Sequence, residues 1–195
     1  IYHLELDNNN ISKIHSSIQN AESLTNLYLS NNSITEMPIE LTTLNLYVLM
    51  LDGNRLTKIF ENIGNIKTLS ILNLHNNNNI STVPDSIGKM IKLRQLDLRN
   101  NAIAILPNEA ILKLQKSLKY IYLHDNPICK NGWLNANSDM RNMVDQSAEL
   151  YDAGCEPQCS MYCQDRWLDS KTCSRDCNSK ACEFQKLGIF QNIFS

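Results

Sequence analysis

Seven cysteines are the residues of this 195-residue chain whose type and spacing are best suited to chemistry. All seven lie after residue 128, and six fall between residues 155 and 182, where leucine-like residues are scarce. Such a stretch buries too little apolar area to fold without covalent or metal links. The seven are Cys129, Cys155, Cys159, Cys163, Cys173, Cys177 and Cys182.

Two kinds of link fit these cysteines. Disulfides persist outside the cytosol and are rare inside it. Structural zinc is the alternative, because the pairs Cys159/Cys163 and Cys173/Cys177 would supply four thiolates for a tetrahedral site. Zinc ribbons mostly separate paired cysteines by two residues, whereas three separate them in both pairs here. The spacing therefore favours disulfides and keeps zinc as the competing interpretation.

The other reactive side chains form no catalytic arrangement. His3, His15, His75 and His124 are scattered, and no two of them have the spacing of metal ligands. The sequence also contains neither a glycine-rich phosphate loop nor a nucleophile elbow. We therefore expect no enzymatic activity and no cofactor.

Residues 1–128 consist of six copies of one spacing. Each copy has leucine-like residues at its first, fourth, sixth and eleventh places and an Asn at the ninth. The copies begin at residues 1, 24, 46, 69, 93 and 118, and the fourth has its last apolar residue one place late, at Ile80. This pattern and its period resemble the leucine-rich repeat family. The resemblance implies a binding scaffold more strongly than an enzyme.

The spacing also predicts the fold of each repeat. The Leu-x-Leu alternation predicts a short strand. Apolar residues spaced by four and then three predict a helical turn or short helix in the rest of the coil. Met37-Pro38, Val83-Pro84 and Leu106-Pro107 place a proline at the opening of that segment. We expect an α/β fold: a curved solenoid with parallel strands on its concave face, short helices or turns on its convex face, and a small disulfide-rich C-terminal module.

The Asn of each copy falls where the chain leaves the strand. Its amide both donates and accepts hydrogen bonds, so it can satisfy turn backbone groups on neighbouring coils. We expect an internal structural ladder without ligand contacts, formed by Asn9, Asn32, Asn54, Asn77, Asn101 and Asn126.

The cysteine spacing over about residues 159–184 resembles the Notch-type repeat, a small extracellular module with three disulfides and one calcium ion. The run from Cys173 to Cys182 carries the resemblance, which implies the pairs Cys159–Cys182 and Cys163–Cys177 and leaves Cys173 unpaired. The acidic ending of the family is missing after Phe184. Asp165 and Asp169 are weak calcium candidates, because calcium needs six to eight ligands.

The segment between these two parts resembles a C-terminal cysteine cap of extracellular leucine-rich repeat proteins. It starts at Asn126-Pro-Ile-Cys129 and contains a predicted helix over 138–151. A Cys129–Cys155 disulfide would tie it down, and a buried free Cys129 is the alternative. The expected organisation is a solenoid over 1–128, a cap over 129–155 and a partial, degenerate cysteine-rich module with a divergent tail over 156–195.

Candidate binding residues follow from the strand periodicity, because the residues between the leucines point away from the core. Aromatic, Met and Arg side chains are enriched in interface cores. Two groups are predicted to bind a protein ligand or a glycan on the concave face. The first is Tyr28, Val48, Met50 and Ile71, and the second is Arg99, Tyr120 and Tyr122.

Composition narrows the function class. The net charge of −2 and the absence of a basic stripe in the sequence argue against binding nucleic acid or another polyanion. No apolar run is long enough to span a membrane. Asn10, Asn31 and Asn79 begin Asn-x-Ser sequons, the acceptor motif for glycosylation in secreted chains.

The predicted function is non-enzymatic ligand recognition by an extracellular or membrane-tethered receptor-like protein. The chain starts inside a repeat, without Met, so we expect it to be part of a longer protein. The alternative is a cytoplasmic signalling scaffold whose cysteines hold zinc.

Overall fold

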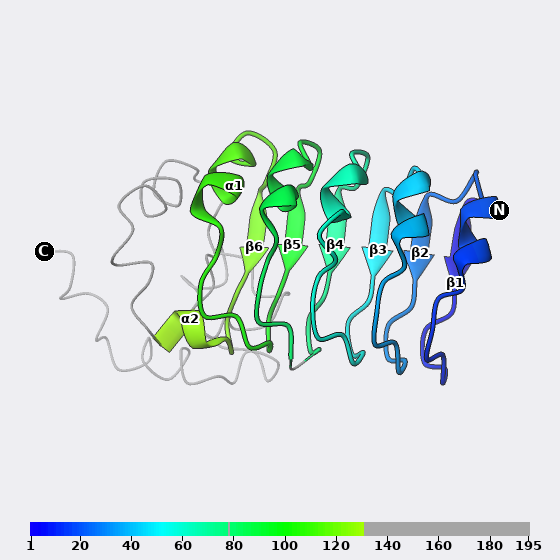
Figure 1. Cartoon of the computed structure of the whole chain (residues 1–195), viewed down its shortest axis with the longest axis horizontal. Coiled ribbons are helices and arrows are strands. Elements are labelled where there is room, and N and C mark those ends of the chain that lie inside the picture. The colour runs from blue at the N-terminus through cyan, green and yellow to red at the C-terminus, as the bar shows by residue number, and fades with distance from the viewer. Residues whose placement is uncertain (78, 131–195) are drawn as a thin grey trace, which may run out of the picture. The chain divides into compact units, whose positions relative to one another are not determined.

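The computed structural model of the chain describes residues 1–77 and 79–130 (Figure 1). The predicted cap helix over 138–151 and the cysteine-rich module over 156–195 lie outside these residues. So do the six cysteines after Cys129 and the calcium candidates Asp165 and Asp169. The disulfide pairing and the calcium ligands therefore stay predictions.

Six parallel strands form one sheet in this part of the chain, and their order in the sheet is their order in the sequence (Figure 1). Each strand is centred on the second leucine-like residue of its repeat. Equivalent residues of neighbouring repeats pair in register, as Leu27 does with Leu49. The six strands predicted from the spacing are confirmed. Their bounds are β1 His3–Glu5, β2 Asn26–Tyr28, β3 Val48–Met50, β4 Ile71–Asn73, β5 Gln95–Asp97 and β6 Tyr120–Tyr122.

A short helical turn lies between each pair of consecutive strands, which confirms the second half of the predicted coil. The first four turns are 3-10 helices, η1 Ser16–Asn20, η2 Ile39–Thr43, η3 Ile63–Asn65 and η4 Asp85–Lys89. The fifth is the α-helix α1 Asn108–Lys113, and α2 Pro127–Lys130 follows β6. Pro38, Pro84 and Pro107 each stand immediately before a turn, with φ near −73°. The proline ring presets that angle.

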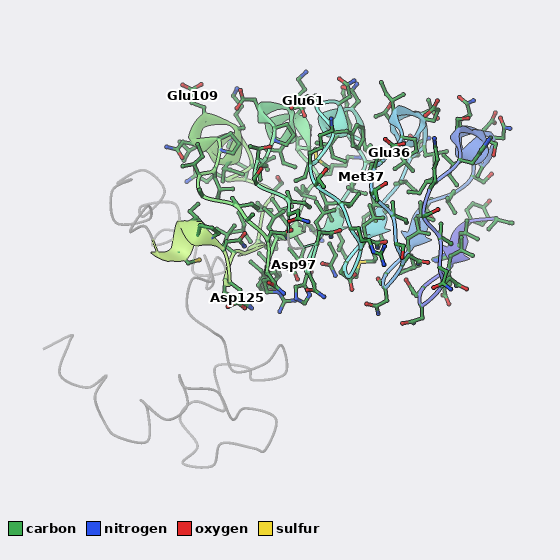
Figure 2. All side chains as sticks on the ribbon, turned by 60° about the horizontal axis from the view of Figure 1, so that its bottom comes forward. Glu36, Met37, Glu61, Asp97, Glu109 and Asp125 are labelled. Atoms are coloured by element: carbon green, nitrogen blue, oxygen red, sulfur yellow. The ribbon has the colours of Figure 1, made fainter. Side chains whose placement is uncertain are left out.

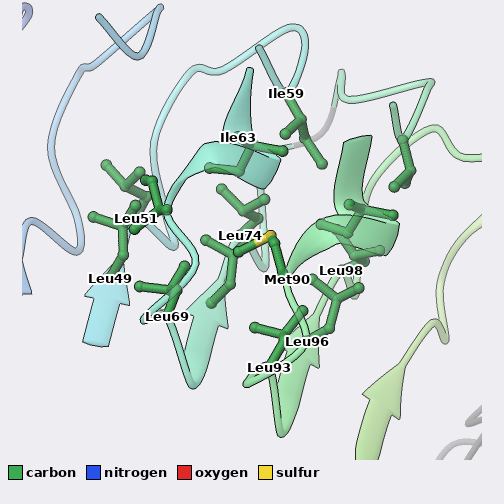
Figure 3. Packing of buried hydrophobic residues seen from close by; sticks show 14 of the residues in the cluster. Leu49, Leu51, Ile59, Ile63, Leu69, Leu74, Met90, Leu93, Leu96 and Leu98 are labelled. Carbon is green, nitrogen blue, oxygen red and sulfur yellow. The ribbon is translucent and has the colours of Figure 1, made fainter. Parts of the chain in front are cut away.

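The hydrophobic core fills the space between the strands and the turns. Leu51, Ile63 and Leu74, seen together in Figure 3, are fully buried. Burying one such side chain stabilises a fold by about 1.5–3 kcal/mol relative to leaving it exposed. In the first coil Ile18 and Ala21 are only partly buried. The predicted apolar rows therefore form one continuous core from the second coil onward.

The side chain of each ladder Asn makes hydrogen bonds within its coil and, from Asn32 onward, to the coil before it. Asn54 is typical: its Nδ2 donates to the carbonyl of Leu51 at 3.0 Å and to that of Leu29, one coil earlier, at 2.9 Å. Its Oδ1 accepts the backbone N–H of Ile34 at 2.9 Å. Asn9, in the first coil, is exposed and donates only to the carbonyls of Leu6 and Asp7.

The extra residue in the fourth repeat interrupts this ladder. In the other coils the N–H two places after one ladder Asn donates to Oδ1 of the next, as that of Ile103 does to Asn126 at 2.9 Å. The corresponding donor in the fourth repeat is Asn79, whose N–H bonds instead to the carbonyl of Asn77 at 2.9 Å. Among the described residues, the buried Oδ1 of Asn101 has no hydrogen-bond partner.

The residue before each ladder Asn adopts a left-handed backbone, with φ between 50° and 64°. Asn and Asp tolerate this conformation and Gly adopts it freely. Gly53 has a second reason to be glycine, since a Cβ there would lie 2.3 Å from Oδ1 of Asn31. These turns carry the chain off the strand in every coil. The residues are Asn8, Asn31, Gly53, Asn76, Asn100 and Asp125.

Candidate ligand-binding face

The strand face is the surface formed by outward side chains of β1–β6 and by the residue two places after each strand. Because the strands pair in register, equivalent residues line up in three rows across the sheet. The two predicted groups occupy separate parts of it. The first group lies on β2–β4, and Tyr120 and Tyr122 of the second group lie on β6, with Arg99 just after β5.

Arg99 is held in place by a buried carboxylate. Its Nε donates to Asp97 Oδ1 and Oδ2 at 2.9 and 3.0 Å, and its Nη2 lies 2.5 Å from Asp97 Oδ2. Asp97 is only 1% exposed, and its Oδ1 also accepts the backbone N–H of Arg99 at 3.1 Å. The hydrogen bonds to Asp97 raise the pKa of Arg99 above its ordinary value. The guanidinium is therefore charged and oriented before any ligand arrives.

Two tyrosines extend this arrangement. The guanidinium carbon of Arg99 lies 5.3 Å from the ring centre of Tyr122, within the range of a cation–π contact. The rings of Tyr122 and Tyr120 are stacked, with centres 6.3 Å apart and an interplanar angle of 4°. Tyr120 is 45% exposed. We call Asp97, Arg99, Tyr120 and Tyr122 the Arg–Tyr cluster.

His124 borders the Arg–Tyr cluster and lies in the same row as Arg99, two places after β6. Burial lowers the pKa of His124, and the positive charge of Arg99 lowers it further, against smaller opposing effects of Asp125 and Asp97. Its Nδ1 is buried and has no hydrogen-bond partner in the part of the chain that the structure describes. The neutral imidazole is therefore the favoured form at neutral pH.

The first predicted group, on β2–β4, differs from the expectation at one residue, Val48. Val48 is buried, with only 7% of its surface exposed, because it is flanked in register by Asn26 of β2 and Ile71 of β4. Tyr28, Met50 and Ile71 are half-buried. This part of the face therefore exposes less apolar surface than the sequence suggested.

Polar side chains that the sequence analysis left out of the binding groups form hydrogen bonds across the coils of β2, β3 and β4. Asp52 Oδ1 accepts hydrogen bonds from Ser30 Oγ at 2.7 Å and from Asn73 Nδ2 at 2.9 Å. Asp97 was also missed as a positioning residue. The Asp-x-Arg spacing at the end of β5 could have indicated it, since residues two apart in an extended chain share a face.

The other predicted sites among the described residues lie outside the strands. Asn10, Asn31 and Asn79 are exposed, and Nδ2 of Asn31 donates to Asn8 Oδ1 at 3.1 Å. Cys129 is disulfide-bonded. Its predicted pairing with Cys155 stays a prediction, because that residue lies outside the described part.

The described residues contain neither a metal-ligand cluster nor a membrane-spanning helix. Within residues 1–77 and 79–130 no three His, Cys, Asp or Glu side chains gather as metal ligands. No helix in these ranges has the length and apolar character needed to cross a membrane.

Comparison with known sequences identifies the family. Sequence profiles described as leucine-rich repeat match residues 23–44, 44–103 and 67–128, which together cover more than half of the chain. The chain belongs to the leucine-rich repeat family. Its repeats build a protein-binding scaffold of a kind that is typically non-enzymatic.

Leucine-rich repeat relatives match over short stretches. Transforming growth factor beta activator LRRC32 of Mus musculus is 43% identical over 61 residues, which are 30% of this chain and 9% of that protein. Leucine-rich repeat-containing G-protein coupled receptor 4 of Xenopus tropicalis is 37% identical over 68 residues, 35% of this chain and 7% of the receptor. The chain thus spans under a tenth of the length of these curated relatives.

Solved leucine-rich repeat structures share the fold. Internalin C2 of Listeria monocytogenes has a TM-score of 0.57 at 25% identity, covering 66% of this chain and 57% of that one. The ectodomain of the Arabidopsis thaliana receptor kinase GASSHO1/SCHENGEN3, in complex with CASPARIAN STRIP INTEGRITY FACTOR 2, has a TM-score of 0.53 at 32% identity, covering 59% and 14%. The plant peptide hormone receptor RGFR1, in complex with RGF2, has a TM-score of 0.57 at 27% identity, covering 63% and 24%.

Proposed function

We propose that the chain is a recognition segment of an extracellular or membrane-tethered receptor-like protein, and that its strand face binds a protein or peptide ligand at the Arg–Tyr cluster. The observation that carries this proposal is the fixed geometry of Arg99 between buried Asp97 and the ring of Tyr122. A side chain that is oriented in advance loses little conformational entropy when a ligand binds.

The Arg–Tyr cluster suits a ligand with a polar group beside an apolar one. The contacts with Asp97 use Nε and Nη2 of Arg99, so that Nη1 is not committed to Asp97 and can meet a carbonyl or carboxylate. Tyr120 offers an exposed ring, stacked on that of Tyr122. Tyr and Arg are the residue types most often found at interface hot spots.

Three observations support an extracellular location. Cys129 is disulfide-bonded, and disulfides are rare in the cytosol. The similar proteins include a G-protein coupled receptor and two plant receptors that were solved with a bound partner, one of them as its ectodomain. The sequons at Asn10, Asn31 and Asn79 are exposed, as glycosylation requires. The cytoplasmic scaffold with a zinc site has no comparable support among the described residues.

Screening the multimerised chain against an array of secreted and cell-surface proteins tests the proposal. Ligands that bind the natural sequence are then titrated against Tyr122→Ala and Tyr120→Ala. We expect each change to weaken binding by about 1–2 kcal/mol, a factor of about 5–30 in Kd.

The matched control is Tyr47→Ala, an exposed tyrosine outside the outward rows of the strand face. It should leave Kd unchanged, and all three variants should melt within a few degrees of the natural chain. Equal losses for Tyr47→Ala and Tyr122→Ala would refute the assignment to the Arg–Tyr cluster.

A further inference from the structure

A second surface of the solenoid is strongly basic. Its cations come in register from two adjacent coils, with each pair 24 or 25 residues apart in the sequence. We call this surface the basic flank. It consists of Lys89, Lys92 and Arg94, where the fourth repeat passes into the fifth, and of Lys113, Lys116 and Lys119, where the fifth passes into the sixth.

The structure brings the two coils of the basic flank into direct contact. The backbone N–H of Lys119 donates to the carbonyl of Arg94 at 2.8 Å. Turns η4 and α1 touch, because a Cβ on Gly88 would lie 2.9 Å from Cα of Ala110. Lys89 is the last residue of η4, and Lys113 is the last residue of α1. Just before β5 and β6, Arg94 and Lys119 therefore present like charges at the strand spacing of about 4.8 Å.

The segments that carry these cations contain no carboxylate. Residues 86–96 and 110–124 contain no Asp or Glu. The acids of the two turns, Asp85 and Glu109, stand at the opposite ends of η4 and α1. Figure 2 shows Glu61 and Glu109 beside the helical turns. Lys89, Lys92, Lys113 and Lys116 are exposed and make no ion pair within the described residues.

This finding changes the expectation drawn from composition. A net charge of −2 and the absence of a basic run in the sequence argued against a polyanion partner. The basic flank is invisible in the linear sequence, because the solenoid assembles it from segments one repeat apart. Mutual repulsion of these cations is relieved when a densely charged anion binds.

The shape and composition of the basic flank point to a polymer. Lys92, Arg94 and Lys116 line a groove of about 390 Å³ that also includes Tyr47, Ser70 and Ser117. A groove fits an extended chain better than it fits a planar bilayer. Five of the six cations are lysines, compact point charges without the planar fork with which Arg grips a single carboxylate or phosphate. Hydroxyls in the lining add hydrogen-bonding groups for a hydrated ligand.

We propose that the basic flank binds a sulfated polysaccharide. The choice of an extracellular polyanion rests on the extracellular location proposed above. The surface itself is separate from the strand face, because its cations lie before the strands or in the turns and not in the outward rows. One molecule could therefore hold a protein ligand and a polysaccharide at once.

Titration with fluorescein-labelled heparin at several salt concentrations tests the proposal. The flank variant is Lys89→Gln/Lys92→Gln/Lys116→Gln, and the charge-matched control is Lys13→Gln/Arg55→Gln/Lys58→Gln. We expect the flank variant to bind heparin at least about tenfold more weakly and the control to bind nearly as well as the natural chain. The dependence of log K on log salt should be shallower by about 2 for the flank variant, because fewer counterions are released. Heparin should also raise the melting temperature of the control but not of the flank variant.

Several results would overturn the proposal: no heparin binding by the natural chain, equal loss in the two triple variants, or equally tight binding of poly-glutamate or of phosphatidylserine vesicles. Melting curves without heparin check that both variants are folded. Tyr120→Ala/Tyr122→Ala should bind heparin normally. A failure of the strand-face proposal is thereby separated from a failure of this one.

Discussion

Asn54 and Asn101 occupy the same place in their coils but differ by one hydrogen bond. Oδ1 of Asn54 accepts the N–H of Ile34, whereas the buried Oδ1 of Asn101 has no partner among the described residues. Both Nδ2 groups bridge carbonyls of two coils. The cost of removing each side chain should therefore differ.

We predict that Asn54→Ala destabilises the solenoid by about 1–3 kcal/mol, because the buried N–H of Ile34 loses its acceptor and the carbonyls of Leu29 and Leu51 each lose one of two Asn donors. Asn101→Ala should cost about 1 kcal/mol less, since no N–H loses an acceptor. Asn9→Ala, at an exposed position, should change stability by less than about 0.5 kcal/mol. Urea unfolding of the three variants measures the differences. Equal losses at Asn54 and Asn101 would contradict the role assigned to Oδ1.

His124 makes stability depend on pH. Its pKa in the folded chain is lowered from 6.5, mainly by burial and then by Arg99. Below pH 6.5 the unfolded chain takes up the proton first, so stability is complete above that pH and falls as the pH drops toward the folded pKa. We predict that His124→Gln loses less stability than the natural chain between pH 7.5 and 5.5. Paired urea titrations at the two pH values measure this, and identical losses would show that His124 is not the titrating group.

At the scale of elements, the fourth coil is the irregular one. Its extra residue moves the last apolar side chain of the repeat to Ile80 and diverts the N–H of Asn79 to the carbonyl of Asn77. The strands on either side still pair in register, since Leu72 pairs with Leu96. The turn therefore absorbs the insertion, and the sheet is not disturbed.

Deleting one Asn from the Asn76–Asn79 run restores the regular spacing. The apolar residue then stands two places after the ladder Asn, and its N–H can donate to Oδ1 of Asn101 as in the other coils. We predict that the deletion stabilises the chain by about 1 kcal/mol, because a buried acceptor gains its partner. Thermal melting measures the change. A lower melting temperature would mean that the longer turn makes contacts worth more than this hydrogen bond.

At the scale of the whole molecule, the cysteines decide between the two cellular locations. The resemblance of residues 159–184 to the Notch-type repeat, together with the predicted Cys129–Cys155 pair, predicts three disulfides and one thiol at Cys173. Mass spectrometry with and without reduction, on protein made in an oxidising compartment, counts them. Bound zinc with seven alkylatable cysteines in the native protein would support the cytoplasmic alternative.

The solenoid could be predicted from the sequence because its information is local and repeated. A period of two within Leu-x-Leu determines which side chains of a strand point inward, and the in-phase Asn marks each turn. Six repetitions stack in only one register without exposing leucines. The strands, the buried rows and the contrast between the two sides of each coil therefore followed from spacing alone.

Only the tertiary structure decided how outward side chains combine across coils. Periodicity gives the direction of a side chain but not its depth, so Val48 is outward yet buried between its neighbours in register. Charge balance and aromatic stacking depend on groups a full repeat apart. The contact of Arg99 with Tyr122 and the pairing of lysine rows along the basic flank exist because one coil lies about 4.8 Å from the next.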